Sequence, residues 1–469
     1  MRFFKPALQG GKLISHLTDI EGNWRYMQRW VDRSRTIQWQ EGALTFRQPT
    51  KPVTPTFVYG GDFCDKGPGD LRIGTALTKF KAAHPTQVHL LAGNREIKCR
   101  RFTYELAPDK IRERLLSGPA AFWRTEMPPQ RYVIQHMQQA NPTASAEEVE
   151  RYVSKLSTEQ CQTLYLKWML NETMGCGPFK GKPDTFEYRR MELAEISEQS
   201  AEQISDEMVT QSFIDSVAPT GVISNYLRNA QLGVVLGETL FLHGAVTPAN
   251  IGYVPGLSES GTRIDNAKEW VEALNAWYKA QIEDWEKNPV EKKMSPPGHK
   301  PLDRYVLFNP QSVVTTNWYR NNQLAPISDE VVRFLNRAGI YRVVTGHQPF
   351  SDFPLIIRQP SSLEVIVGDT GYSDPNNPHD NRGQAIHNLE INEHGVVEID
   401  AVRQDGSVIK QRLPSRVQVQ MKEDIDLGHF TEDGRLIRLD ASSQYVSSQL
   451  DGFAVKDEPL ETPQSRLIQ

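Results

Sequence analysis

"QVHLLAGNREI" (residues 87–97) turns from apolar to polar within a few residues. Its first half is an apolar run that stops at Gly93, which predicts a short buried strand followed by a sharp exit. Asn94 comes directly after that glycine. The stretch therefore predicts a strand whose carboxyl end presents a polar side chain, and similar strand exits recur along the chain.

Two earlier stretches repeat this pattern. "KLISHLT" (12–18) and "TFVYG" (56–60) also read as short buried strands bounded by polar residues or glycine. Amphipathic patterns between the strands predict helices over 23–34 and 70–80, and Asp70 is placed to cap the second one. Alternating strands and helices predict a parallel sheet, in which ligands lie outside the carboxyl ends of the strands.

Residues 103–228 have a different character. Strand signals vanish, and patterns such as "SAEEVERYVSKL" (145–156) indicate helices. Ser145 and Glu148 have the spacing of a capping box at the start of that helix. We interpret this part of the chain as a helical insertion that could form a cap.

Strand signals return after residue 230. Strand patterns lie in four stretches: 232–246, read as a hairpin, and 341–350, 363–373 and 385–400. A helix over 265–287 carries an aromatic stripe that indicates packing. Beyond about residue 415 the pattern weakens, and "DEPLETPQSRLIQ" (457–469) is predicted to be a loose tail.

The composition favours a soluble globular protein, and the lack of a signal peptide and of paired cysteines favours the cytoplasm. Hydrophobic residues are 38% and charged residues 24% of the chain, enough for a substantial core with a solvated surface. A net charge of −5 without runs of like charge gives no sign of a nucleic-acid partner. The apolar run 233–242 is far shorter than the ~20 residues of a membrane span, and the N-terminus lacks the apolar region of a signal peptide. The four cysteines form no CxxC pair.

Five polar residues sit at the ends of apolar strand patterns. They are Asp19 in "LTDIEGN", Asp62 in "YGGDFCDKG", Asn94 in "LAGNREI", His243 in "FLHGAV" and His347 in "TGHQPF". Each alone reads as a turn former or a structural histidine. Together, carboxylates, an amide and two imidazoles along one sheet rim suit a pair of divalent metals that share a bridging carboxylate.

These five blocks resemble, in order, the GDxHG, GDxxDRG, GNHE, HGG and GHxx blocks of the calcineurin-like metallophosphoesterases. They are most similar to the phosphoprotein-phosphatase branch and the bacterial diadenosine-polyphosphate hydrolases. The resemblance covers roughly residues 12–100 and 232–390. It implies an α/β fold, an αββα sandwich of two mixed sheets with a large helical insertion. The expected division is as follows: 1–102 and 231–415 for the two halves of the phosphoesterase domain, 103–230 for the insertion, a helical insert near 265–288, and 416–469 for a C-terminal extension.

The resemblance also implies a ligand set and an activity. The implied metal ligands are Asp19, Glu21, Asp62, Asn94, His243 and His347, with Asp369 and Glu96 in supporting positions. Asp62 would bridge two divalent ions, Mn²⁺ first, with Fe, Zn or Mg as alternatives. The implied reaction is hydrolysis of phosphomonoesters by metal-bound hydroxide, with a phosphoprotein as the first choice of substrate. Nucleotide polyphosphate hydrolysis remains an alternative.

Three residues depart from the family pattern. Glu21 stands in place of a histidine and makes the site more anionic, which favours Mn²⁺ or Mg²⁺ over Zn²⁺. Lys66 replaces an arginine; it keeps the positive charge but cannot hold a phosphate with two parallel N–H groups as a guanidinium does. Arg95 replaces the histidine that would protonate the leaving group, and arginine does not release its proton. Arg95 could instead pair with Asp65 and hold a phosphate oxygen.

These departures leave two kinds of protein open. One is a phosphohydrolase in which Asp65, Arg95 and Lys66 serve catalysis, slowed by the missing acid. The other is a weakly active or inactive phosphoesterase fold that only binds its ligand. Four arginines that read mainly as surface residues are further candidate phosphate contacts: Arg189, Arg190, Arg263 and Arg320.

Overall fold

The fold is described from a computed structural model of the chain. It covers residues 11–48, 53–139, 145–178, 183–290, 293–320, 323–324, 327–350, 353–358, 363–370, 386–402, 406–415, 427–431, 433–440, 444–451 and 454–460.

The first of two large sheets has seven strands in the order β16-β15-β14-β1-β4-β5-β6. These strands are β1 (Lys12–Leu17), β4 (Thr54–Tyr59), β5 (Val88–Leu91), β6 (Ala230–Gln231), β14 (Ile386–Ile391), β15 (Val397–Val402) and β16 (Val408–Leu413). Strands β1, β4, β5 and β6 run parallel, whereas β14, β15 and β16 join antiparallel. The parallel half is the one that the sequence predicts, and its carboxyl ends share one edge.

The second large sheet has five strands in the order β12-β13-β11-β8-β7. They are β7 (Gly233–Leu236), β8 (Thr239–Leu242), β11 (Arg342–Thr345), β12 (Leu355–Arg358) and β13 (Glu364–Val367). Strands β8, β11 and β13 are parallel, and β7 and β8 form the predicted hairpin. This sheet is therefore also mixed.

The two sheets pack face to face. Alternate residues of the central strands enter one apolar cluster between the sheets: Ile14, Val58 and Leu91 from the first, and Phe241, Val344 and Ile366 from the second. Neighbours of these residues along the strands, such as Tyr59 and Leu90, belong to the other cluster, beneath the helices. This two-residue period is what a strand buried on both faces requires.

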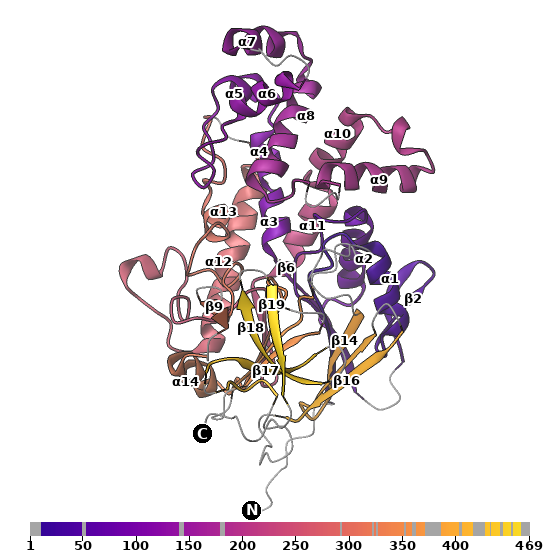
Figure 1. Cartoon of the computed structure of the whole chain (residues 1–469), viewed down its shortest axis with the longest axis vertical. Coiled ribbons are helices and arrows are strands. Elements are labelled where there is room, and N and C mark those ends of the chain that lie inside the picture. Colours follow the sequence, from indigo (N-terminus) through magenta and orange to yellow (C-terminus); the bar gives the residue numbers. More distant parts are fainter. Residues whose placement is uncertain are drawn as a thin grey trace, which may run out of the picture.

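Helices cover the outer faces and complete an αββα sandwich (Figure 1). Helices α1 (Trp24–Arg33) and α2 (Asp70–Ala83) lie on the first sheet, where the Trp30 ring packs 5.8 Å from that of Phe57. Helices α12 (Ala267–Lys287) and α14 (Asp329–Arg337) lie on the second, with Trp270 against Phe334. Trp270 and Trp285 are buried, so the aromatic stripe packs as predicted. Short helices α3 (Asn94–Cys99) and α13 (Pro301–Tyr305) lie between the sandwich and the insertion.

The middle of the chain is helical and rises above the sandwich in Figure 1. It contains α4 (Arg101–Glu105), α5 (Ile111–Ser117), α6 (Pro129–Gln138), α7 (Ala146–Lys155), α8 (Thr158–Trp168), a π-helical turn (Met169–Thr173), α9 (Thr185–Ser197), α10 (Asp206–Ser216) and α11 (Val222–Asn229). The capping box at Ser145 and Glu148 is present. The prediction of a helical stretch is thus confirmed.

Two sequence predictions are wrong. The N-cap of α2 is Gly69, because the Asp70 carboxylate turns instead to the backbone N–H of Asp65. The predicted tail begins inside a strand, since β17 (Leu436–Leu439), β18 (Tyr445–Asp451) and β19 (Ala454–Pro459) form a third sheet. Residues 461–469 lie outside the described part. Short ribbons also pair β2 (Ile37–Gln40) with β3 (Ala43–Phe46) and β9 (Tyr319–Arg320) with β10 (Gln323–Leu324).

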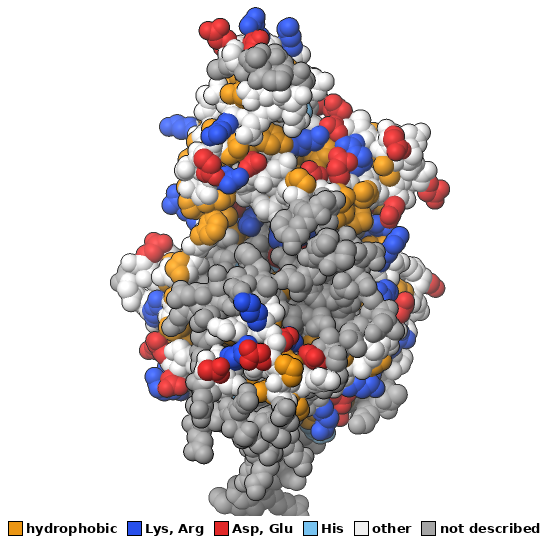
Figure 2. All heavy atoms as spheres, in the orientation of Figure 1, with side chains coloured by type: hydrophobic (Ala, Val, Ile, Leu, Met, Phe, Trp, Pro, Cys, Tyr) orange, Lys and Arg blue, Asp and Glu red, His pale blue; other side chains and the backbone are white. Residues whose placement is uncertain are grey.

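Acidic and basic side chains are interspersed over the coloured parts of the face seen in Figure 2, in keeping with the small net charge. Among the helices of the described residues, none is long and apolar enough to cross a bilayer.

Candidate metal centre

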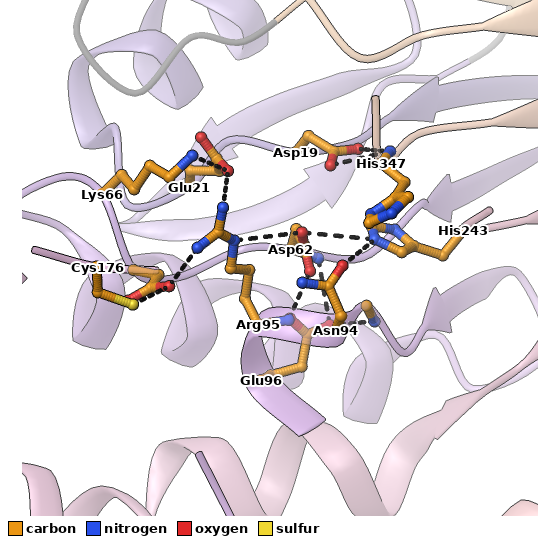
Figure 3. Close-up of polar contacts among 12 residues, drawn as sticks. Asp19, Glu21, Asp62, Lys66, Asn94, Arg95, Glu96, Cys176, His243 and His347 are labelled. Atoms are coloured by element: carbon orange, nitrogen blue, oxygen red, sulfur yellow. Dashed lines mark hydrogen bonds and ion pairs between the residues drawn. The ribbon is translucent and has the colours of Figure 1, made fainter. Parts of the chain in front are cut away.

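The carboxyl ends of five strands bring the candidate residues to one place (Figure 3). Asp19, Asp62 and Asn94 follow the parallel strands β1, β4 and β5 of the first sheet. His243 and His347 follow β8 and β11 of the second. Because the sheets are stacked with these edges adjacent, residues more than three hundred positions apart touch, as Asp19 and His347 do.

Several of these residues have a left-handed backbone. The φ angle is 51° at Asp19, 48° at Glu21, 53° at Asp62, 112° at Asp65 and 74° at His347. Non-glycine residues rarely adopt this conformation, which costs of order 1–3 kcal/mol each and clusters at functional sites. The strain indicates that these side chains are aimed by the surrounding structure.

Neighbouring glycines let the backbone approach the carboxylates. A Cβ atom on Gly93 would collide with the Asp62 carboxylate, and one on Gly346 would collide with that of Asp19. Glycine is therefore needed at both positions for these side chains to lie where they do.

Ligand atoms of three residues converge. One donor atom each of Asp62, His243 and His347 lies within 4.8 Å of the other two. His243 Nε2 is 3.5 Å from Asp62 Oδ2 and 3.3 Å from Asn94 Oδ1. Ligand atoms bound about 2.1 Å from a tetrahedral ion lie about 3.4 Å apart. The observed spacing therefore suits a single divalent ion among these four side chains.

The two imidazoles direct ring nitrogens to this position. The Nδ1–H of His243 donates to the carbonyl of Gly60 at 2.8 Å, which orients Nε2 toward Asp62 and Asn94. Burial opposes its charge, yet the carboxylates of Asp62 and Asp19 raise the pKa of His243 to about 10. Burial and the nearby His243 lower the pKa of His347 to about 3. Nδ1 of His347 is buried without a hydrogen-bond partner.

Buried carboxylates concentrate negative charge beside this group. Burial, and then the Asp369 carboxylate, raise the pKa of Asp19 well above its usual value. Burial and the Asp62 carboxylate raise the pKa of Glu96 to about 8, although Glu96 Oε1 accepts the N–H groups of Gly93 (2.6 Å) and Asp62 (3.3 Å). Carboxylates that raise one another's pKa are stabilised by a cation, so the residues fit a bound metal. Glu96 and Asp369 thus lie close to Asp62 and Asp19, respectively.

Arg95 occupies the centre of a second group. Its Nη1 is 2.8 Å from Asp65 Oδ2, its Nη2 is 3.4 Å from Glu21 Oε1, and its Nε is 3.7 Å from Asp62 Oδ2. Lys66 Nζ lies 3.1 Å from the same Glu21 oxygen. The expected pairing of Arg95 with Asp65 is present. Glu21, expected as a metal ligand, instead faces two cations, and it is not among the three residues whose donor atoms converge.

Sequence reasoning missed three residues of this site. Cys176 Sγ donates to Asp65 Oδ2 at 2.8 Å, and the Thr185 hydroxyl donates to Asp65 Oδ1 at 3.1 Å. Both come from the helical insertion, and no local pattern connects them with Asp65. Lys98 follows Asn94 by one helical turn, a spacing that could have revealed it. Burial and the charge of Arg95 lower its pKa.

The candidate arginines outside the centre have structural partners. Arg189 is buried against Asp70 (3.1 Å), and Arg190 pairs with Glu187 and Asp206. Arg263 donates to backbone carbonyls at Ile251 and Ala249. The structure thus gives these three arginines protein partners, and the side chain of Arg320 lies outside the described part.

No protein-family model and no curated protein sequence matches the chain. Solved structures with a similar chain path include two described as a cold-active protein tyrosine phosphatase, the first from a psychrophilic Shewanella species. The first shares 13% identity at a TM-score of 0.41, over 86% of this chain and 80% of that one. The second shares 13% identity at a TM-score of 0.42, over 88% of this chain and 81% of that one.

A third is a protein serine/threonine phosphatase from Saccharomyces cerevisiae, described as similar to human phosphatase PP5. It shares 10% identity at a TM-score of 0.35, over 88% of this chain and 82% of that one. All three TM-scores lie below 0.5, so the similarity is limited to a distant likeness in chain path.

Proposed function

We propose that the protein is a metal-dependent phosphohydrolase that acts on phosphomonoesters. One observation carries the proposal: acceptor atoms of Asp62, Asn94, His243 and His347 converge beside the guanidinium of Arg95. A divalent ion held by the first four would supply Lewis-acid polarisation of a phosphoryl group and an activated water. Phosphate chemistry needs such a centre next to fixed positive charge.

The chain's own cations suit a phosphate. Arg95 and Lys66 present N–H donors at the rim of the site, with 14% and 22% of their side chains exposed. Both can hold oxygens of a bound phosphoryl group. Arg95 cannot release a proton to the departing oxygen, so esters whose leaving groups depart unprotonated should react fastest.

Among phosphomonoesters we propose a phosphoprotein as the substrate class, because "LHGAVTP" (242–248) and "GHQ" (346–348) resemble the phosphoprotein-phosphatase branch most closely. A nucleotide polyphosphate is the alternative, and a panel of phosphopeptides and dinucleoside polyphosphates separates the two.

The proposal is tested by hydrolysis of an activated aryl phosphate with added Mn²⁺. We expect metal-dependent turnover by the wild type and a loss of at least about 100-fold in Asp62→Asn, which removes a charged ligand. Asp32→Asn, on the exposed side of α1, is the matched control and should keep full activity. Equal rates for wild type and Asp62→Asn, or turnover that ignores metal, would mean that the protein is not this enzyme.

A further inference from the structure

The two halves of the expected dinuclear centre differ. One half has ligand atoms spaced for an ion: Asp62 Oδ2, Asn94 Oδ1 and His243 Nε2, with His347 beside them. The other half would need Asp19 and Glu21, with Asp62 as the bridge. Neither Asp19 nor Glu21 is among the converging donor atoms in the described part of the chain.

A guanidinium lies where the second half would form. Arg95 spans Glu21 Oε1 (3.4 Å) and Asp62 Oδ2 (3.7 Å), the oxygen that a bridging carboxylate would share between ions. Lys66 takes the same Glu21 oxygen at 3.1 Å. Both Asp19 oxygens accept the backbone N–H of His347 at 3.1 Å. These side chains are already committed to positive partners or to backbone hydrogen bonds.

Arg95 cannot make room by losing its proton, since arginine stays charged in proteins. Its place is also fixed. Its backbone N–H donates to Asp62 Oδ1 at 2.8 Å, and its Nη1 binds Asp65, which Cys176 and Thr185 hold from the insertion. A second divalent ion beside this fixed charge would be strongly repelled, because the site is buried and weakly screened.

We propose that the centre binds one divalent ion, on Asp62, Asn94, His243 and His347, and that the Arg95 guanidinium takes the place of the second. This inference rests on the proposed metal dependence and specifies its stoichiometry. Arg95 then balances Glu21 and Asp65 in the resting protein and faces the phosphate when substrate binds. Two ions, as the family resemblance implies, would not fit together with Arg95 in its present position.

The test is a count of Mn²⁺ per chain. Purified protein is saturated with Mn²⁺, freed of unbound ion by gel filtration and analysed by mass spectrometry, with electron paramagnetic resonance as a second readout. We expect one ion per chain and the spectrum of an isolated ion in the wild type. Two spin-coupled ions would overturn the inference but leave the proposed function standing. No bound ion would overturn both.

The role of Arg95 is tested with Arg95→Gln. Removing the guanidinium should raise the count to two, because Glu21 and Asp62 then face a site without fixed charge between them. Arg95→Lys keeps a positive charge and should still bind one ion, as should Arg25→Gln on the exposed face of α1. One ion in Arg95→Gln would overturn the role of Arg95. The wild-type count and spectrum do not depend on how any variant folds.

Discussion

At the scale of single residues, Cys176 connects the helical insertion with the centre. Its thiol reaches Asp65 from 111 positions along the chain. Burial and the Asp65 carboxylate raise the pKa of Cys176 well above its usual value, so the thiol stays protonated and donates its hydrogen. Because Asp65 in turn holds Arg95, Cys176 acts on the site as a positioning residue.

We expect Cys176→Val to lower kcat/KM about fivefold, the effect of losing one hydrogen bond of about 1 kcal/mol. Cys176→Ser keeps a donor and should restore most of the activity, which a purely structural role would not explain. Cys161→Val removes another buried thiol of the insertion, whose Sγ faces the carbonyl of Val153 instead of Asp65, and it should leave kcat/KM unchanged. Steady-state kinetics with the aryl phosphate measure kcat/KM for each variant. Equal losses of kcat/KM in Cys176→Val and Cys176→Ser would contradict the positioning role of Cys176.

At the scale of elements, the insertion also caps a helix of the sandwich. The Glu192 carboxylate of α9 accepts the N–H groups of Leu71 (3.1 Å) and Arg72 (3.0 Å) at the start of α2. This takes up N–H groups that a helix leaves open in its first turn. Nearby, Arg189 binds Asp70, which accepts the N–H of Asp65. Helix α9 therefore supports both α2 and the loop that carries Asp65.

Glu192→Ala should lower the free energy of unfolding by about 3 kcal/mol, because it leaves two N–H groups of α2 without their acceptor and removes the carboxylate that lies 3.7 Å from Arg189 Nε. Glu195→Ala removes the ion pair between Glu195 and Arg72, in which the Glu195 side chain is 53% exposed. This variant should change the free energy of unfolding by less than about 0.5 kcal/mol. Urea unfolding measures both. Hydrogen exchange should show faster exchange at the Leu71 and Arg72 amides in Glu192→Ala only; unchanged exchange there would refute the cap.

At the scale of the whole molecule, two histidines lie in the apolar layer between the sheets. His16 of β1 packs 5.8 Å from Phe241, and His387 of β14 points to the same face of the sheet. All four ring nitrogens are buried without hydrogen-bond partners. Burial, and then the charge of His387, lower the pKa of His16 to about 3, and burial lowers that of His387 to about 4.

Stability should therefore fall in acid. The pKa of each histidine is lower in the folded than in the unfolded chain, where it is ~6.5, so below that pH the unfolded state binds more protons. Above about pH 6.5 both histidines are neutral in either state and the free energy of unfolding keeps its full value. It decreases as the pH falls toward the folded-state pKa values of about 4 and about 3. Between pH 7 and pH 5, each of the two histidines should lower the free energy of unfolding by about 2 kcal/mol.

His16→Leu and His387→Leu should each reduce the loss of unfolding free energy between pH 7 and pH 5 by about 2 kcal/mol. His394→Leu replaces a histidine with 69% of its side chain exposed and should keep the wild-type dependence. Urea titrations at several pH values give the dependence of the unfolding free energy on pH. The same dependence in the wild type and the two buried variants would show that these histidines do not change protonation on unfolding.

Local patterns account for most of the framework. The strands β1, β4, β5, β8 and β11 were predicted because an apolar run between glycines is a local signal. The third sheet was missed because β17, β18 and β19 carry mixed polar and apolar residues without a clean period. Asp70 was misplaced as a cap because its carboxylate is drawn to Arg189, a partner that is distant in sequence.

The sequence alone determined that polar residues follow the strands and that parallel order gathers them at one edge, since periodicity and glycine act over a few residues. Only the tertiary structure decided which charges pair. Glu21 turns to Arg95 and Lys66, and Asp65 is held by Cys176 and Thr185, because those contacts depend on how separate elements pack. Coulomb interactions at 3–4 Å follow spatial neighbours, which no local pattern specifies.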